Sequence, residues 1–100
     1  MAITYEMGYT LKEFESVLTG GFSKEGSGFT SEKLSDNRWH IRIPAIDSDV
    51  TVSGSPQPPR VLGAFSLPVL QVSFQFIPDT DEIRQTFLDR FHRYFHKGGG

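Results

Sequence analysis

The residues best suited to chemistry lie near the C-terminal end of the chain. Asp89, His92 and His96 are spaced three and four positions apart, so a helix would place all three on one solvent-facing strip. Such a set could hold zinc or nickel, but a metal centre needs a further ligand and supporting hydrogen bonds. Because two histidines are a weak ligand set, the spacing favours a polar helix face whose histidines complement the helix dipole.

Basic side chains surround these histidines. Arg90, Arg93 and Lys97 give the last two turns of the predicted helix a positive charge that could contact phosphate groups. Basic residues are also expected at a helix C-terminus, where they offset its partial negative charge. The whole chain carries a net charge of −2. We therefore expect these residues to stabilise the helix rather than to bind nucleic acid.

A second candidate for chemistry is His40, which could activate Ser31 or Ser53 for hydrolysis. The chain lacks a Gly-x-Ser-x-Gly nucleophile elbow, and no carboxylate is assigned to orient the histidine. The glycines between residues 20 and 28 match neither the P-loop nor the dinucleotide-binding fingerprint. A small histidine-dependent or metal-dependent enzyme is therefore the alternative to a non-catalytic protein.

Composition narrows the class of protein. The chain has 100 residues, 37% hydrophobic and 22% charged, which is typical of a single globular domain. It has no cysteine, which excludes disulfides and thiolate metal sites. The acidic balance disfavours non-specific binding to nucleic acid or anionic membranes. Without an apolar run of roughly 18 residues or a signal peptide, the chain is expected to be one soluble, cytoplasmic domain over residues 1–100.

The elements that must position these residues are clearest after residue 68. Residues 69–77 alternate, which predicts a strand with one buried and one wet face. The expected buried side chains are Leu70, Val72, Phe74 and Phe76. Pro78 ends the strand, and residues 79–81 offer caps for a helix whose apolar stripe is Ile83, Phe87, Leu88, Phe91, Tyr94 and Phe95. Arg84 lies at the edge of this stripe, where Glu13 or Glu15 could pair with it.

The first 28 residues predict a strand, a helix and a loop. Ile3, Tyr5 and Met7 alternate with polar residues, and Thr10 and Glu13 fit a capping box. The apolar stripe of this helix is Leu11, Phe14, Val17 and Leu18. Gly20-Gly21 is expected to end the helix because glycine readily adopts a left-handed conformation. Residues 22–28 are expected to form a flexible loop.

The middle of the chain predicts a meander of antiparallel strands. A turn at Asp36-Asn37 would place Leu34 opposite Trp39 and Lys33 opposite His40. A second turn at Asp47-Ser48 would give the pairs Ala45–Val50 and Ile43–Val52, with Trp39, Ile41, Ile43 and Ala45 facing the core. The proline-rich segment 54–60 is expected to be a loop that breaks the sheet. Residues 61–65 could form a short strand or an extended loop.

These elements predict an α+β two-layer sandwich, with an antiparallel sheet of about five strands and two helices on one face. The expected order is β-α-β-β-β-β-α, followed by a disordered glycine tail at 98–100. This order resembles the repeat unit of TATA-box-binding-like folds, and the resemblance concerns topology alone, which implies no function.

With both helices on one face, the other face of the sheet is a candidate binding surface. Its candidate residues are Lys33, His40, Arg42, Gln71, Ser73 and Gln75. Nucleic-acid binding through this face ranks third because of the acidic balance of the chain. Stacking on bases also needs exposed aromatic rings, whereas Trp39 is expected to face inward. Uncharged polar surface is less costly to desolvate than charged surface, so a homodimer through this face or a sheet edge is a further hypothesis. The sequence therefore predicts a small non-catalytic binding or interaction module without a cofactor, whose partner is a protein, a small ligand or a second copy.

Overall fold

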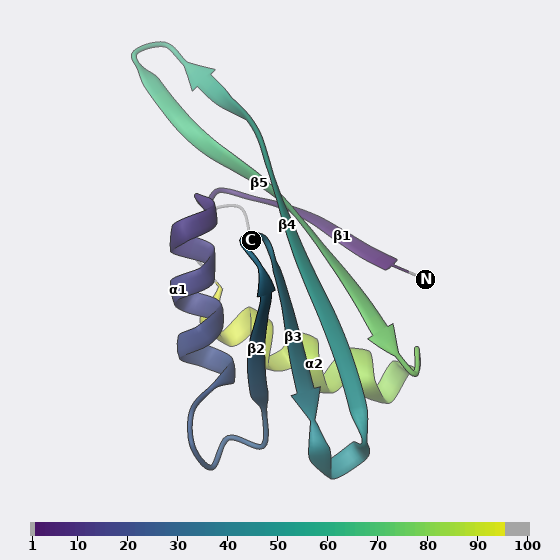
Figure 1. Ribbon diagram of the computed structural model, residues 1–100. Helices are drawn as coiled ribbons and strands as arrows, with labels where there is room; N and C mark the ends of the chain where they lie inside the picture. Colours follow the sequence, from purple (N-terminus) through teal and green to yellow (C-terminus); the bar gives the residue numbers. More distant parts are fainter. Residues whose placement is uncertain (1, 96–100) are drawn as a thin grey trace.

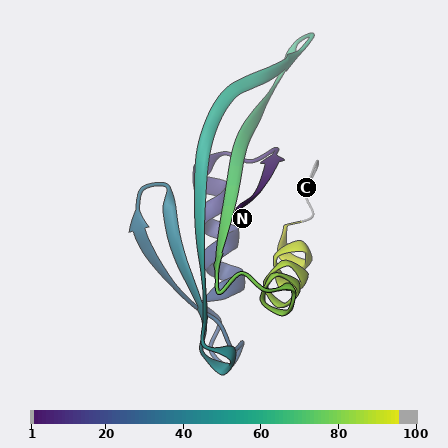
Figure 2. The same ribbon diagram turned by 90° about the vertical axis from the view of Figure 1, so that its right-hand side faces the viewer.

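The computed structural model describes residues 2–95 as one antiparallel sheet covered by two helices (Figure 1). The elements are β1 (Ala2–Met7), α1 (Leu11–Phe22), β2 (Thr30–Ser35), β3 (Arg38–Ile43), β4 (Ser48–Leu62), β5 (Phe65–Ile77) and α2 (Asp81–Tyr94). The five strands are arranged in the order β1-β5-β4-β3-β2. Both helices pack on the same side of the sheet (Figure 2). The predicted α+β class and element order are confirmed.

The core lies between the sheet and the helices. All four side chains predicted to be buried on β5 are at most 3% exposed. The rings of Phe74 and Phe91 meet edge to face with centroids 4.8 Å apart, which joins β5 to α2. Phe14 of α1 packs 5.5 Å from the ring of Trp39. Burial of each large apolar side chain contributes roughly 1.5–3 kcal/mol, so these contacts dominate the stability of the domain.

Helix α1 begins at the predicted capping box. The Thr10 hydroxyl accepts a hydrogen bond from the Glu13 amide at 3.1 Å, and the Glu13 carboxylate accepts one from the Thr10 amide at 3.0 Å. These two bonds satisfy amides that have no partner within the helix.

The helix ends later than predicted, because it continues through Gly20 and Gly21 to Phe22. Phe22 is fully buried and stacks on Phe87 with ring centroids 4.9 Å apart. A Cβ atom at Gly21 would lie 2.9 Å from Cγ of Tyr94, so glycine is required there for the close approach of α2. The predicted stop at Gly20-Gly21 is wrong, and the loop begins at Ser23.

The hairpin of β2 and β3 turns at Asp36-Asn37 as predicted, but its register differs from the prediction. A register shift lies between Lys33 and Ser35, and Lys33 pairs with Trp39. Leu34, which was expected opposite Trp39 in the core, is 48% exposed. A β-bulge inserts one residue without a partner, and hydrophobic alternation alone does not reveal it.

This shift moves the residues of β2 to the opposite faces of the sheet. Cross-strand partners share a face, so Lys33 and Ser31 lie on the helix-covered side with Trp39 and Ile41. The prediction that Lys33 belongs to the open face is therefore wrong. Glu32 takes this place, opposite His40.

The connection between β3 and β4 is longer than the predicted two-residue turn. A single 3₁₀ turn, η1 (Pro44–Ile46), precedes Asp47, which has a left-handed φ of 47°. The observed pairs are Ile43–Ser48, Ile41–Val50 and Trp39–Val52. Because the register differs from the predicted one by four residues, an even number, the faces of the strand are preserved and both valines are buried as predicted. Ala45 lies in η1 and is exposed, contrary to the prediction.

The proline-rich segment 54–60, predicted to be a loop, is part of the longest strand. β4 pairs with β5 as far as the pair Leu62–Phe65, with a register shift between Gln57 and Arg60. β3 pairs with β4 only as far as Ser53, so within residues 2–95 the outer edge of β4 has no neighbouring strand beyond it. Proline is tolerated at such an edge and at bulges because no ladder hydrogen bond is lost.

Residues 61–65 form the tip of this hairpin. Val61 and Leu62 end β4, Gly63-Ala64 is the turn, and Phe65 begins β5. Gly63 has a φ of 62°, which suits the first central position of a two-residue hairpin turn. We name residues 55–69 the arm. It projects from the body (Figure 1), and the molecule measures 47 × 28 × 24 Å along its principal axes.

Among residues 2–95, neither helix combines the length and the apolar character needed to cross a bilayer. His96, Lys97 and the predicted disordered tail at 98–100 lie outside the described residues.

Candidate functional site

The predicted metal ligands do not form a ligand set in the part of the chain that the structure describes. Asp89 accepts a hydrogen bond from the Gln85 amide at 2.9 Å. Nε2 of His92 lies 3.5 Å from the Tyr5 hydroxyl, and the two rings are 5.7 Å apart. His96 falls outside the described residues, and residues 2–95 contain no group of three His, Cys, Asp or Glu side chains suited to a metal. His92 therefore belongs to a contact between α2 and β1.

The basic residues at the end of α2 differ in their surroundings. Nε of Arg90 donates a hydrogen bond to the carbonyl of Gly21 at 2.6 Å. Its guanidinium also lies 5.2 Å from the ring centroid of Phe29 and 5.1 Å from that of Tyr94. Arg93 is exposed. Arg90 thus satisfies a carbonyl at the end of α1 and joins the two helices.

Arg84 pairs at the start of its own helix. Its Nε donates to the Asp79 carboxylate at 2.7 Å. This hydrogen bond from Arg84 lowers the pKa of Asp79 to about 2. Arg84 thus pairs with Asp79 and Asp81 rather than with Glu13 or Glu15, the possible partners suggested by the sequence. Glu15 instead accepts from Nζ of Lys33 at 2.9 Å, on the helix-covered side of the sheet.

The open face of the sheet carries a compact ion-pair cluster. Asp49 lies 2.9 Å from Nη1 of Arg42 and 3.0 Å from Nε2 of His40, and Asp47 lies 2.8 Å from Nη2 of Arg42. The hydrogen bond to Asp49 raises the pKa of Arg42. Sequence reasoning placed His40 and Arg42 on this face but missed both aspartates, because the expected register left Asp49 away from them. The guanidinium of Arg42, which a ligand would need, is therefore already paired with the carboxylates of Asp47 and Asp49.

The other predicted residues of the open face lie together on β5. Gln71, Ser73 and Gln75 pair with Glu6, Thr4 and Ala2 of β1. The Ser73 and Thr4 hydroxyls are 3.4 Å apart. The structure therefore brings together five of the six predicted residues, and Lys33 is the one that it places elsewhere.

The proposed hydrolytic arrangement around His40 is not formed with Ser31. Ser31 lies on the helix-covered face, where its hydroxyl contacts that of Ser23. Ser53 lies opposite Arg38 rather than opposite His40. His40 has gained the orienting carboxylate of Asp49, but Ser31 is excluded as its nucleophile.

The arm carries a feature that sequence reasoning did not assign to a site. Four of its large apolar side chains are exposed: Val61 by 68%, Leu62 by 55%, Phe65 by 73% and Leu67 by 47%. Elsewhere in the described residues, Leu34 and Ile77 are the large hydrophobic side chains classed as exposed. Single exposed apolar residues are ordinary, but a cluster indicates an interaction site.

Three of these side chains share one side of the arm. Leu62 pairs with Phe65, and Arg60 pairs with Leu67, so the pairing places these residues on the same side. Nη2 of Arg60 also lies 2.6 Å from Glu6, which belongs to the open face of the sheet. We name Leu62, Phe65 and Leu67 the apolar arm face, which continues the open sheet face toward the tip.

The edges of the arm are poorly suited to pairing with another strand. Pro56, Pro58 and Pro59 lie in β4, and Pro68 lies in β5. Proline has no amide hydrogen to donate to an added strand. A partner would therefore contact the arm through side chains rather than by extending the sheet.

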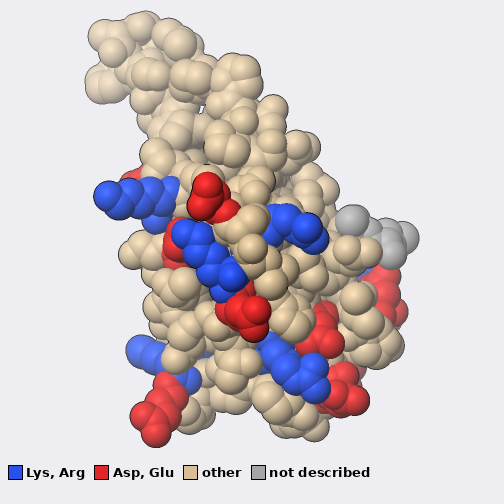
Figure 3. Space-filling model, viewed as in Figure 1, with Lys and Arg blue, Asp and Glu red and all other residues tan. Residues whose placement is uncertain are grey.

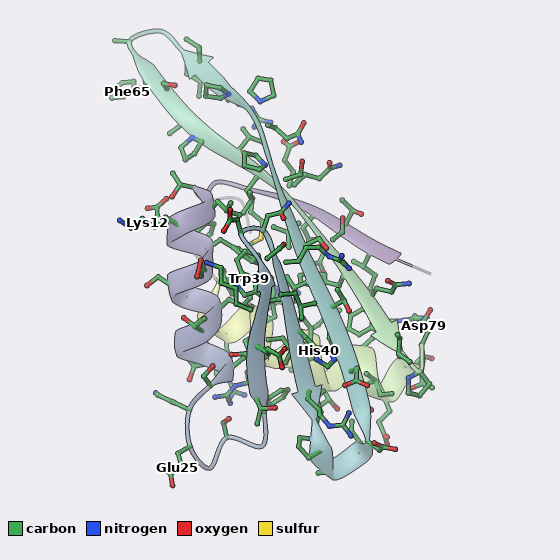
Figure 4. All side chains as sticks on the ribbon, in the orientation of Figure 1. Lys12, Glu25, Trp39, His40, Phe65 and Asp79 are labelled. Carbon is green, nitrogen blue, oxygen red and sulfur yellow. The ribbon has the colours of Figure 1, made fainter. Side chains whose placement is uncertain are left out.

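A pocket opens on the helical side of the molecule, between the start of α1 and the end of α2. Its volume is about 590 Å³, and its lining is Tyr9, Thr10, Lys12, Glu13, Ser16, Val17 and Tyr94. We name it the α1–α2 pocket. Figure 4 shows Lys12 pointing outward from α1, with Phe65 near the tip of the arm and Trp39 within the body.

Comparison of the chain with protein-family models, with curated proteins and with solved structures gives no match.

Proposed function

We propose that this protein is a cytoplasmic, non-catalytic interaction module that assembles with copies of itself, and that the arm makes the contact. The observation that carries this proposal is the exposed cluster of Leu62, Phe65 and Leu67 on a hairpin that projects from the body. The outer part of the arm also has no charged side chain, as Figure 3 illustrates.

The energetics of a two-stranded ribbon support this role. An isolated hairpin is only marginally stable in water, because it has no second layer to cover its apolar side chains. Removing one large apolar side chain from water stabilises a complex by roughly 1.5–3 kcal/mol before the costs of association. The apolar arm face therefore gains both stability and order when another surface covers it.

The distribution of charge supports a second copy as the partner. The chain has a net charge of −2, and Arg60 is the sole ionisable side chain of the arm, so the remaining residues carry −3. Because the single charge of the arm, on Arg60, is already paired with Glu6, this apolar arm meets no electrostatic repulsion from an acidic body. Homo-oligomers are also the commonest soluble assemblies.

The open sheet face is a weaker candidate for this contact. It carries the cluster of His40, Arg42, Asp47 and Asp49, whose desolvation would cost more than that of aliphatic or aromatic side chains. A contact through β5 would bury Gln71, Ser73 and Gln75. A Gln75→Lys variant tests this competing face, because it places a charge on the open face of β5 without touching the arm.

The experiment measures the mass of the protein in solution by light scattering and by sedimentation at several concentrations. Wild-type protein should give a multiple of 11.2 kDa, and Phe65→Ser should shift the mass to that of one chain. Leu34→Ser is the matched control, because it removes an exposed apolar side chain from β2, outside the arm. The proposal fails if wild-type protein stays monomeric at millimolar concentration. It also fails if Gln75→Lys dissociates the assembly and Phe65→Ser does not.

A further inference from the structure

We infer that the arm of one copy docks in the α1–α2 pocket of another copy. This inference rests on the proposed self-association, and it adds the surface that receives the arm. The contact joins two different surfaces, so it is heterologous. The side chains of the apolar arm face enter the pocket and pack against its lining, which includes the half-buried ring of Tyr94.

The pocket offers an apolar floor and a polar rim. Tyr9 is 3% exposed, and its ring packs 5.5 Å from that of Phe95, which fixes the floor in place. Val17 and Tyr94 are half-buried, and Lys12 on the rim is exposed. Mostly apolar concavities with a few polar groups are typical binding sites.

The size and chemistry of the two surfaces match. Pockets that bury small ligands have volumes of about 300–1,000 Å³, and the volume of about 590 Å³ falls in this range. An aromatic side chain such as Phe65 packs favourably edge to face against other rings, and such a pair adds about 0.5–1.5 kcal/mol beyond its buried area. Tyr94, which lines the pocket and is half-buried, supplies such a ring.

The arm cannot reach the pocket of its own chain. The base of the arm packs on the start of α1, where a Cβ atom at Gly54 would lie 3.1 Å from the Leu11 side chain. From this base, the eight residues Ser55 to Leu62 extend the strand by roughly 25 Å away from the body. The tip therefore lies far from the pocket beside its base, and an arm that fills this pocket comes from a second molecule.

The prolines favour this mode of contact over the addition of a strand. Pro56, Pro58 and Pro59 remove donors from the edge of β4, so side chains must supply the binding energy. A narrow ribbon with apolar side chains on one side suits a pocket better than it suits a flat surface. The low charge of the arm also limits the cost of desolvation on entry.

The test uses two variants that each damage one of the two surfaces. Phe65→Ser alters the arm and leaves the pocket intact. Ser16→Lys places a long charged side chain in the pocket from an exposed position of α1, and it leaves the arm intact. Gly20→Lys is the matched control, because it adds the same side chain to the same helix, where a Cβ atom meets nothing within 4 Å.

We expect each damaged variant to be monomeric alone, and an equimolar mixture of the two to recover a species of two chains by light scattering. Recovery is expected because the mixture contains one intact arm and one intact pocket. Gly20→Lys should keep the wild-type mass. Wild-type mass for Ser16→Lys beside a monomeric Phe65→Ser would overturn the pocket as the receptor and leave arm-mediated self-association standing. Failure of the mixture to associate, or dissociation by Gly20→Lys, would also overturn it, whereas a monomeric wild type would remove both proposals.

Discussion

Arg90 and Gly21 join the two helices of the domain through one hydrogen bond, from the guanidinium Nε to the backbone carbonyl, at 2.6 Å. The same guanidinium lies between the rings of Phe29 and Tyr94, at 5.2 and 5.1 Å from their centroids. The bond occupies a carbonyl in the last turn of α1, which has no partner within the helix. The contact therefore fixes the end of α1 against α2.

Replacing Arg90 should test this contact directly. Arg90→Leu removes a charged hydrogen bond and the contact with the aromatic rings, so we expect a loss of about 2–3 kcal/mol in the free energy of unfolding. Urea unfolding measures it. Arg93→Leu is the control, because Arg93 is exposed on the same helix and its loss should stay within about 0.5 kcal/mol. Equal losses in the two variants would contradict the structural role of Arg90.

The two adjacent glycines of α1 should respond oppositely to alanine. Gly20→Ala adds a methyl group where nothing lies within 4 Å, so it should stabilise the helix by about 0.5–1 kcal/mol. Gly21→Ala adds one 2.9 Å from Cγ of Tyr94, and the displacement should cost about 1–3 kcal/mol. Thermal unfolding of both variants checks the prediction. Stabilisation by both alanines would show that α1 and α2 do not pack this closely.

The two sides of β5 should differ sharply in sensitivity. Phe74 is fully buried among the aromatic rings of α2, and Phe74→Ala should lower the free energy of unfolding by about 3–5 kcal/mol. Gln75, its neighbour in sequence, is exposed on the open face, so Gln75→Ala should cost little. Denaturant unfolding of both variants makes the comparison. Similar losses would contradict the assignment of faces.

Acid should weaken the start of α2 through Asp79. The hydrogen bond from Arg84 holds the pKa of Asp79 at about 2 in the folded protein, below the ordinary value of 3.8. A pKa that is lower in the folded than in the unfolded protein stabilises the native state at pH values above the ordinary pKa of 3.8. This stabilisation is lost as the pH falls through about 2. The melting temperature of wild-type protein should therefore fall more steeply between pH 4 and 2 than that of Asp79→Asn. Parallel curves would contradict the pairing.

The elements that could be predicted from the sequence are those whose signals are local. The alternation of residues 69–77, the capping box at Thr10 and the apolar stripe of α2 each depend on neighbours along the chain. The bulge at Leu34 could not be predicted, because no local signal marks it; it places Lys33 on the helix-covered side, where Lys33 pairs with Glu15 of α1. For the same reason one of the six candidate residues was assigned to the wrong face.

The arm was missed because its strongest local signal points to a loop. Prolines within residues 54–60 normally exclude a strand. Here they are tolerated because no strand of the described part of the chain pairs with the outer edge of β4 beyond Ser53. The sequence does contain one signal for a hairpin turn, because the apolar residues Leu62 and Phe65 flank Gly63-Ala64. Without the register of the body, nothing in the sequence shows that this turn projects into solvent.

Trp39, packed on Phe14 at the centre of the body, gives the protein a built-in optical reporter. It is the single tryptophan of the chain and is fully buried, so its fluorescence follows the melting of the body. The arm and the α1–α2 pocket contain no tryptophan, so docking between copies should leave this emission unchanged. Two measurements on one unlabelled sample therefore distinguish the two processes: the emission spectrum reports unfolding, and light scattering reports dissociation.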